Sequence, residues 1–160
     1  MSKFKKGGGK GTPAISTASL PDIVFMLLFF FMVTTVMRET ELKIEVSQPE
    51  ATEVKKMEKK SLVSYIYIGS PTSSQQATFG TNARIQLNDV TFSRKEVAEI
   101  QNFVNSERLA KDESEIPYMT TSIKADQNVT MGIVTDVKTE LRKVNALKIN
   151  YSTKKSKEAI

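Results

Sequence analysis

Hydrophobic residues are concentrated in one unbroken block near the start of the chain. Between residues 15 and 37 the side chains are almost all apolar, and the run from Ile23 to Val33 contains no polar residue. At about 1.5 Å per helical residue, a helix of that length covers the hydrocarbon core of a bilayer, which is about 30 Å thick. The pattern therefore predicts one transmembrane helix over residues 15–37, preceded by a basic tail over residues 1–14.

A secretory signal peptide is the alternative explanation of a basic start followed by an apolar block. The block is long for a signal peptide, and the residues after it, MRETELKIEV, contain no small-x-small cleavage site. We therefore expect an uncleaved anchor. Lysines dominate the flank before the block, whereas charges of both signs follow it, so the positive-inside rule places the N-terminus in the cytoplasm.

The polar remainder of the chain changes its pattern near residue 61. Residues 38–60 mix charges of both signs and lack a sustained apolar period, which predicts a solvated, charged linker. From residue 61 to residue 153, strand and helix periods alternate. LVSYIYI is typical of a strand, and RIQLNDVTF predicts two short strands folded about Asn88 and Asp89. YMTTSIK and LKINYST predict two further strands.

Two helices are expected between these strands. Ser93 and Glu96 form a capping box before the first helix, which should end before Asp112. The second helix should follow the ADQN turn and stop at Asn145. The predicted fold class is α+β: a single N-terminal transmembrane helix, then a small domain over residues 61–153 with two helices packed on one face of a β-sheet, and a tail over residues 154–160.

Composition removes several function classes. The 160 residues include no cysteine and no histidine, which excludes disulfides, thiol chemistry, the common zinc sites and histidine-dependent triads. No nucleophile–base pattern or cluster of metal ligands is visible, so we expect neither an enzyme nor a cofactor or metal site. The net charge of +5 is concentrated at the two ends, without a basic face that carries aromatic residues, and this argues against nucleic-acid binding.

Asp22 is the only charged residue between residues 15 and 37. In one interpretation Ser19 is an N-cap, Pro21 lies in the first turn, and Asp22 stabilises the helix start by about 1 kcal/mol. In the other, Asp22 lies at membrane depth, where removal from water favours the protonated form of a carboxyl and lets it exchange a proton near neutral pH. Such a proton-carrying residue would need walls and polar contacts from other subunits.

Three further residues of the block are candidates for contacts with partner helices: Phe29, Thr34 and Thr35. Phenylalanine side chains within an apolar helix pack on a partner or on lipid. The two threonines do not lie above Asp22 on the helix, and threonine commonly bonds back to its own backbone.

Together, the basic tail, the span LPDIVFMLLFFFMVTTVM, the charged linker and the C-terminal stretch IKADQNVTMGIVTDVKTELRKVNALKINYST resemble the ExbD/TolR family of biopolymer transport proteins. The resemblance covers nearly the whole chain and is greatest to ExbD of the Bacteroidetes type. It departs from the family pattern at Pro21, at Met131, where a tyrosine is common, and in a polar insertion over residues 69–82.

The resemblance implies a subunit of an ion-driven inner-membrane motor. Its helices would sit as a pair inside a pentameric ExbB/TolQ-type subunit, with Asp22 as the group on which protonmotive force acts. The domain would be periplasmic, would form a homodimer, and would contact a TonB-type transducer or peptidoglycan. The expected function is therefore a proton-channel and force-transmitting subunit serving TonB-dependent transport. The alternatives are a TolR-like subunit of the Tol-Pal system and a passive membrane anchor or adaptor.

Overall fold

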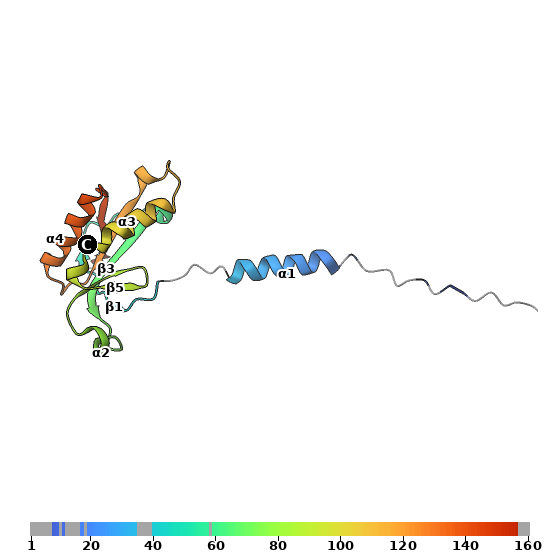
Figure 1. Cartoon of the computed structure of the whole chain (residues 1–160), viewed down its shortest axis with the longest axis horizontal. Helices are drawn as coiled ribbons and strands as arrows, with labels where there is room; N and C mark the ends of the chain where they lie inside the picture. The colour runs from blue at the N-terminus through green and yellow to red at the C-terminus, as the bar shows by residue number, and fades with distance from the viewer. Residues whose placement is uncertain are drawn as a thin grey trace, which may run out of the picture. The chain divides into compact units, whose positions relative to one another are not determined.

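The chain forms two compact units that divide between Glu39 and Thr40 in the computed structural model (Figure 1). The structure describes residues 8–9, 11, 17, 19–34, 40–57 and 59–156. The two units are described separately below.

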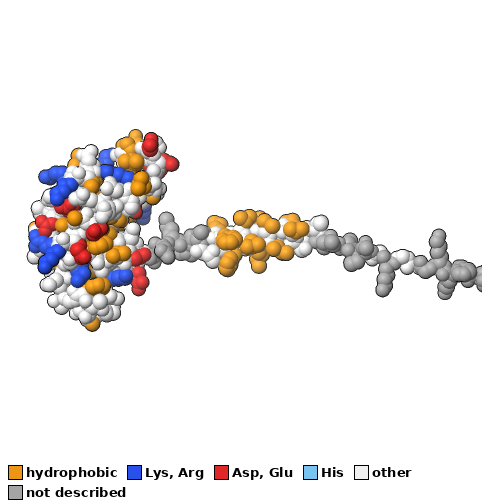
Figure 2. Space-filling model, viewed as in Figure 1, with side chains coloured by type: hydrophobic (Ala, Val, Ile, Leu, Met, Phe, Trp, Pro, Cys, Tyr) orange, Lys and Arg blue, Asp and Glu red, His pale blue; other side chains and the backbone are white. Residues whose placement is uncertain are grey.

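The first unit contains the helix α1 (Ser19–Thr34). Pro21 fits the first turn, where a missing N–H breaks no helical hydrogen bond, and Asp22 is the acidic residue of that turn. Ser19 is the first helical residue, whereas the capping interpretation placed it just before the helix. None of the residues of α1 is buried within the chain, and Figure 2 shows hydrophobic side chains along its visible face.

The length of α1 differs from the predicted span. The helix has 16 residues, which corresponds to about 24 Å. Among the residues that the structure describes, no helix combines the length and the apolar character required to cross a membrane. Residues 15–16 and 35–37, the two ends of the predicted span, lie outside the described residues, as does most of the predicted tail over residues 1–14.

The second unit is built on a mixed β-sheet. Over the described residues the sheet has six strands, with the order β5-β4-β3-β6-β7 and with β1 paired to one end of β3. β3 runs antiparallel to β4 and β1 and parallel to β6, while β6 and β7 are also parallel. The bounds are β1 (Ile44–Glu45), β3 (Val63–Pro71), β4 (Arg84–Leu87), β5 (Val90–Phe92), β6 (Thr120–Ala125) and β7 (Ile149–Tyr151).

The helices α3 (Glu99–Leu109) and α4 (Met131–Lys143) lie side by side on one face of this sheet (Figure 1). Each buried aliphatic or aromatic side chain contributes about 1.5–3 kcal/mol, so this face supplies most of the stability of the domain. The sheet and helix residues of the core are Ile66, Ile68, Ile85, Leu87, Ile100, Phe103, Val104, Ile123, Ile133, Val134, Val137 and Leu141. The predicted α+β class, with both helices on one face of the sheet, is confirmed.

Short elements complete the second unit. They are η1 (Lys60–Leu62), α2 (Gln76–Phe79), η2 (Arg94–Glu96), η3 (Ile116–Tyr118), β2 (Glu50–Ala51) and β8 (Lys154–Lys155). β2 and β8 form a separate parallel pair. The Ser93–Glu96 capping box is confirmed, although it opens the 3-10 turn η2 before α3 begins. Asn88, with φ 51°, and Asn145, with φ 58°, occupy the predicted turn and helix stop.

Two segments predicted to lie outside the folded domain contain short strands. Residues 40–51, predicted as solvated linker, form β1 and β2 within the second unit, and Ile44 is only 2 % exposed. Residues 154–155, predicted as tail, form β8. The described fold therefore runs from residue 40 to residue 156, because backbone pairing holds segments whose composition could not build a core.

Candidate functional site

Asp22 is the only ionisable side chain of α1. It contributes to a shallow hollow on the helix surface whose other lining residues are apolar, namely Ile23, Met26, Leu27 and Phe30. α1 itself supplies no cation that could neutralise the carboxylate. Its position in the first turn is electrostatically favourable, because the free N–H groups there carry partial positive charge worth about 0.3–1 kcal/mol to an acid.

The three predicted partner-contact residues differ in what the structure describes. Phe29 is 63 % exposed and, at 100° per residue, lies about 20° from Asp22 around the helix. Thr34 donates from Oγ1 to the carbonyl oxygens of Phe30 at 2.8 Å and Phe31 at 3.3 Å, so its hydroxyl is used within its own helix. Thr35 lies outside the described residues. Phe29 is therefore the predicted contact that shares a helix face with Asp22.

The chain enters the second unit through residues 40–51, which we call the entry segment. β1 pairs with the end of β3 in the register Ile44 to Pro71 and Glu45 to Ser70. Farther on, the N–H of Lys154 donates to Pro49 O, and the N–H of Ser156 donates to Ala51 O, both at 3.0 Å. The entry segment is therefore tied both to the central strand of the sheet and to the last described residues of the chain.

The side chain of Gln86, on β4, binds the backbone of the entry segment. Because Ile85 and Leu87 belong to the core under the helices, the side chain of Gln86 points to the opposite face of the sheet. It is 0 % exposed. Its amide oxygen accepts from Lys43 N at 2.9 Å, and its amide nitrogen donates to Glu41 O at 2.7 Å and Asn88 O at 2.8 Å. Every polar atom of this buried amide is thus paired.

Gly69 allows the entry segment to cross β3. A Cβ atom added at Gly69 would lie 2.0 Å from the carbonyl oxygen of Glu45, a distance that no side chain tolerates. The absence of a side chain therefore lets the two backbones approach one another, which is a common reason for glycine inside a strand.

Asp126 shapes the turn before α4 and also holds the entry segment. Its Oδ1 accepts from Ser47 N at 2.8 Å, and its Oδ2 accepts from Asn128 N at 3.1 Å. The N-cap of α4 is Thr130, so Asp126 acts on the turn and not as a helix cap.

Tyr65, Tyr67 and Lys124 form a cation–π cluster on the same face of the sheet as Gln86. The Lys124 ammonium lies 4.3 Å from the centroid of the Tyr65 ring and 5.1 Å from that of Tyr67. Burial lowers the pKa of Lys124. Burial, followed by the nearby Tyr65, raises the pKa of Tyr67. The Lys124 ammonium is therefore attracted to both tyrosine rings, while burial opposes the charged forms of Lys124 and Tyr67.

Sequence reasoning identified Asp22 but missed the groups that fasten the entry segment. Gln86 gave no local signal of this role, because its two partners in the entry segment, Glu41 and Lys43, lie more than 40 positions earlier in the chain. Gly69 did give one, since a single glycine inside YIYIGSP indicates close approach of another backbone.

The chain was compared with protein families, with curated proteins and with solved structures. A search of curated proteins gave no match, and neither did a search of solved structures. A family model described as "Biopolymer transport protein ExbD/TolR" matches residues 9–156, which include α1, the entry segment and the sheet. This match covers well over half of the 160 residues. The chain therefore belongs to the ExbD/TolR family of biopolymer transport proteins.

Proposed function

We propose that this biopolymer transport subunit carries protons and transmits force in an inner-membrane motor of the ExbB–ExbD type. The motor couples protonmotive force to TonB-dependent transport across the outer membrane. The observation that carries the proposal is Asp22, a single acid in a helix whose other exposed side chains are almost all apolar.

Membrane insertion of residues 15–37 is the first element of the proposal. Side chains such as Phe25, Phe30 and Met32 are 75 %, 63 % and 77 % exposed, and water is an unfavourable surrounding for so much apolar surface. Lipid and partner helices would remove this surface from water. The lysines before the helix favour a cytoplasmic N-terminus, which would leave the second unit in the periplasm.

The partners follow from the family and from the isolation of Asp22. Members of this family generally work with ExbB/TolQ-type subunits. Because α1 provides no counter-charge, a pentamer of such subunits around a homodimer of this chain would provide the walls and polar contacts of a proton path. Phe29, on the same helix face as Asp22, would pack against that surrounding pentamer.

The energy available to Asp22 is modest. One proton moving through 100 mV of membrane potential releases about 2.3 kcal/mol. This amount can bias an equilibrium between two arrangements of packed helices, but it is small compared with covalent chemistry. Protonation and release at Asp22 would therefore rotate or shift α1 relative to its partners, and the motion would pass along the chain.

The entry segment gives the force a defined point of application on the domain. Residues 40–51 follow α1 in the chain and are held to β3, β4 and β8 by backbone pairing and by Gln86. A pull on Thr40 would therefore load the centre of the sheet. The domain would pass this load to a TonB-type transducer, with peptidoglycan as a further partner.

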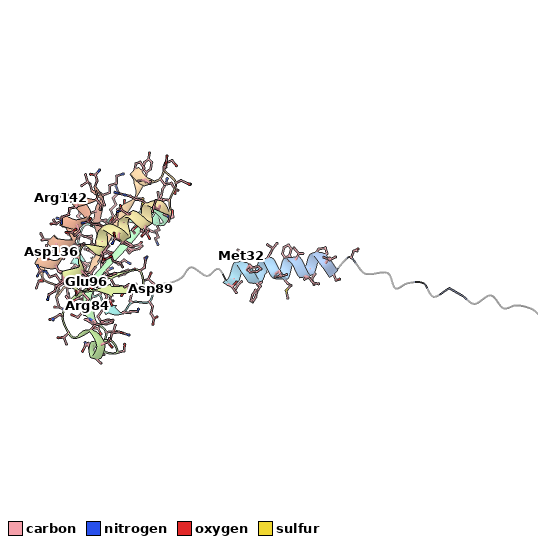
Figure 3. All side chains as sticks on the ribbon, in the orientation of Figure 1. Met32, Arg84, Asp89, Glu96, Asp136 and Arg142 are labelled. Carbon is pink, nitrogen blue, oxygen red and sulfur yellow. The ribbon has the colours of Figure 1, made fainter. Side chains whose placement is uncertain are left out.

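Replacement of Asp22 by asparagine distinguishes a proton-driven motor subunit from a passive membrane anchor. The asparagine preserves size and helix geometry but cannot exchange a proton. We expect Asp22→Asn to abolish energised uptake in cells while protein level and copurification of the membrane partner persist. Asp89→Asn, in the exposed β4–β5 turn of the domain (Figure 3), is the matched control and should leave uptake unchanged. Energised uptake at the wild-type level in Asp22→Asn would contradict the motor role and would support a passive membrane anchor.

A TolR-like role in the Tol-Pal system is the alternative within the family, because the matching family model includes both ExbD and TolR. Both roles would use Asp22 in the same way. Deletion of the gene distinguishes them: loss of TonB-dependent uptake with intact detergent resistance supports the ExbD role. Detergent sensitivity with normal uptake would support the TolR role instead.

A further inference from the structure

A basic groove lies at the end of the domain where the polar insertion meets the N-terminus of α4. It has a volume of about 780 Å³ and is lined by residues from the insertion, β4, η2 and the turn before α4. Three of the lining residues are cationic, namely Arg84, Arg94 and Lys95, and among the described residues that line the groove none is acidic. The insertion over residues 69–82 therefore builds one wall of a positively charged hollow.

The positive charge of the groove is only partly balanced. Arg94 donates from Nε to Asp136 Oδ2 at 2.6 Å, but both side chains are well exposed, at 57 % and 39 %. Lys95 makes no hydrogen bond or ion pair within the described parts of the chain. Arg84 stacks at 4.7 Å over the ring of Phe79, which holds its guanidinium at the rim of the groove.

The start of α4 adds to this field. A Cβ atom added at Gly132 would lie 3.2 Å from Nη2 of Arg94, so the guanidinium covers the first turn of the helix. That turn contains no acidic residue, and the side chain of its N-cap, Thr130, makes no capping hydrogen bond. A cation and the positive end of a helix dipole thus occupy the same place, an arrangement that an anionic ligand would stabilise.

Nearby carboxylates do not fill the groove. Glu96 accepts from Ser93 N at 2.9 Å and Ser93 Oγ at 2.7 Å, and these bonds, with a smaller effect of Arg84, lower its pKa. Asp126 is held in its turn by Ser47 and Asn128. In Figure 3 Glu96 and Arg84 are labelled below Asp136, and Arg142 is labelled above it, farther along α4.

We propose that the basic groove binds an acidic peptide segment of a partner protein. Its volume is in the range of sites that hold drug-sized ligands and far exceeds that of a single inorganic ion, since a water fills about 30 Å³. Guanidinium groups match carboxylates, and the amides of Asn82 and Asn128 can bind a peptide backbone. Phe79 and Ile133 offer contact to an apolar side chain.

Peptide binding in the groove involves no proton transfer at Asp22, so Asp22→Asn should leave the affinity for the peptide unchanged. The test uses the full chain in detergent micelles and a fluorescent peptide that alternates glutamate with glycine and leucine. Fluorescence anisotropy reports its binding, and a peptide with glutamine in place of glutamate serves as the uncharged probe. We expect the acidic peptide to bind and the glutamine peptide to bind at least tenfold more weakly.

Variants locate the binding. Loss of two exposed charge contacts in the double variant Arg94→Gln, Lys95→Gln should weaken binding about tenfold. Arg142→Gln removes the same kind of charge from an exposed position in the last turn of α4 and should change binding less than twofold. Asp136→Asn should strengthen binding, because it releases Arg94 from its ion pair. Thermal unfolding establishes that each variant remains folded.

Two results would overturn the proposal. Equal weakening by Arg142→Gln would mean that the peptide senses only the net charge of the chain. Displacement of the acidic peptide by inorganic phosphate at an equal concentration would mean that the groove holds a small oxyanion and not a peptide.

Discussion

In the membrane-inserted state that we propose, lipid would favour the apolar neighbours of Asp22 in α1 and would disfavour its charge. A carboxylate at the centre of a span costs about 3 kcal/mol, while each Leu, Ile, Phe or Val returns about 0.3–0.6 kcal/mol. The position of Asp22 in the first turn lowers that cost, since the helix N-terminus favours an acid. The proposed insertion of the helix is therefore compatible with one acidic residue at this position.

Replacement of Gly69 should destabilise the domain at one place, where the entry segment passes over β3. In Gly69→Ala the new Cβ would meet the carbonyl oxygen of Glu45 at 2.0 Å, so the backbone must shift. We expect the free energy of unfolding to fall by about 1–3 kcal/mol, measured by urea titration with tyrosine fluorescence.

Gly132→Ala is the control for that substitution. Its Cβ would meet only the flexible end of Arg94, at 3.2 Å, and alanine is a better helix former than glycine. This variant should be neutral or slightly stabilising. Equal stability of Gly69→Ala and the wild type would contradict the close crossing of the entry segment over β3.

At the scale of elements, the entry segment is held by a small number of specific contacts. β1 and β2 have two residues each and contribute little pairing by themselves. The buried amide of Gln86 supplies three of the hydrogen bonds that fix residues 41–43 and the β4–β5 turn. The attachment should therefore fail before the core does.

Gln86→Leu tests this attachment. Leucine fills the space but leaves the N–H of Lys43 and the carbonyl of Glu41 unpaired, which should destabilise the domain by about 2–4 kcal/mol. Hydrogen exchange at the Lys43 amide should accelerate far more than exchange in the core strand β3. Gln127→Leu, at an exposed position, should change stability by less than about 0.5 kcal/mol. Unchanged protection of the Lys43 amide in Gln86→Leu would contradict the fastening role.

The elements differ in how far the sequence predicts them. The hairpin at Asn88, the capping box at Ser93 and the stop at Asn145 depend on residues within a few positions, so local patterns were sufficient. β1 and β2 depend on Gly69 and on a pairing with β8 at the other end of the chain. The surrounding residues 38–60 are rich in charges of both signs and have no sustained apolar period, so the sequence alone predicts a linker there.

The two candidate sites also differ in whether local sequence reveals them. Asp22 is visible in the sequence because one charge interrupts an apolar block. The basic groove is not visible, because its cations come from β4 and η2 while its opposite wall comes from the start of α4. Only the folded sheet brings residues 84, 94–95 and 130 together.

Glu140 should determine part of the decrease in the domain's free energy of unfolding at low pH. Hydrogen bonds from Lys143, and then from Gln101, lower the pKa of this nearly buried carboxyl. The folded state therefore binds a proton less readily than the unfolded state. The stabilisation is complete above the unfolded pKa of about 4.3 and is lost as the pH falls through the lower folded value.

Glu140→Gln should flatten this acid dependence. Urea unfolding between about pH 7 and pH 3 should show a smaller loss of stability in the variant than in the wild type. Glu113→Gln, at an exposed position, removes the same charge and should retain the wild-type slope. Identical slopes for Glu140→Gln and the wild type would mean that the hydrogen bonds at Glu140 do not contribute.

Passage of protons through Asp22 in the assembled membrane complex is the central step of the proposed function. The most direct measurement is proton uptake into liposomes that contain the full chain with its copurified membrane partner, driven by a potassium diffusion potential and followed with an internal pH dye. We predict uptake by the wild type and by Asp89→Asn, and uptake no faster than in empty liposomes for Asp22→Asn. Wild-type proton uptake by the Asp22→Asn complex would contradict the account.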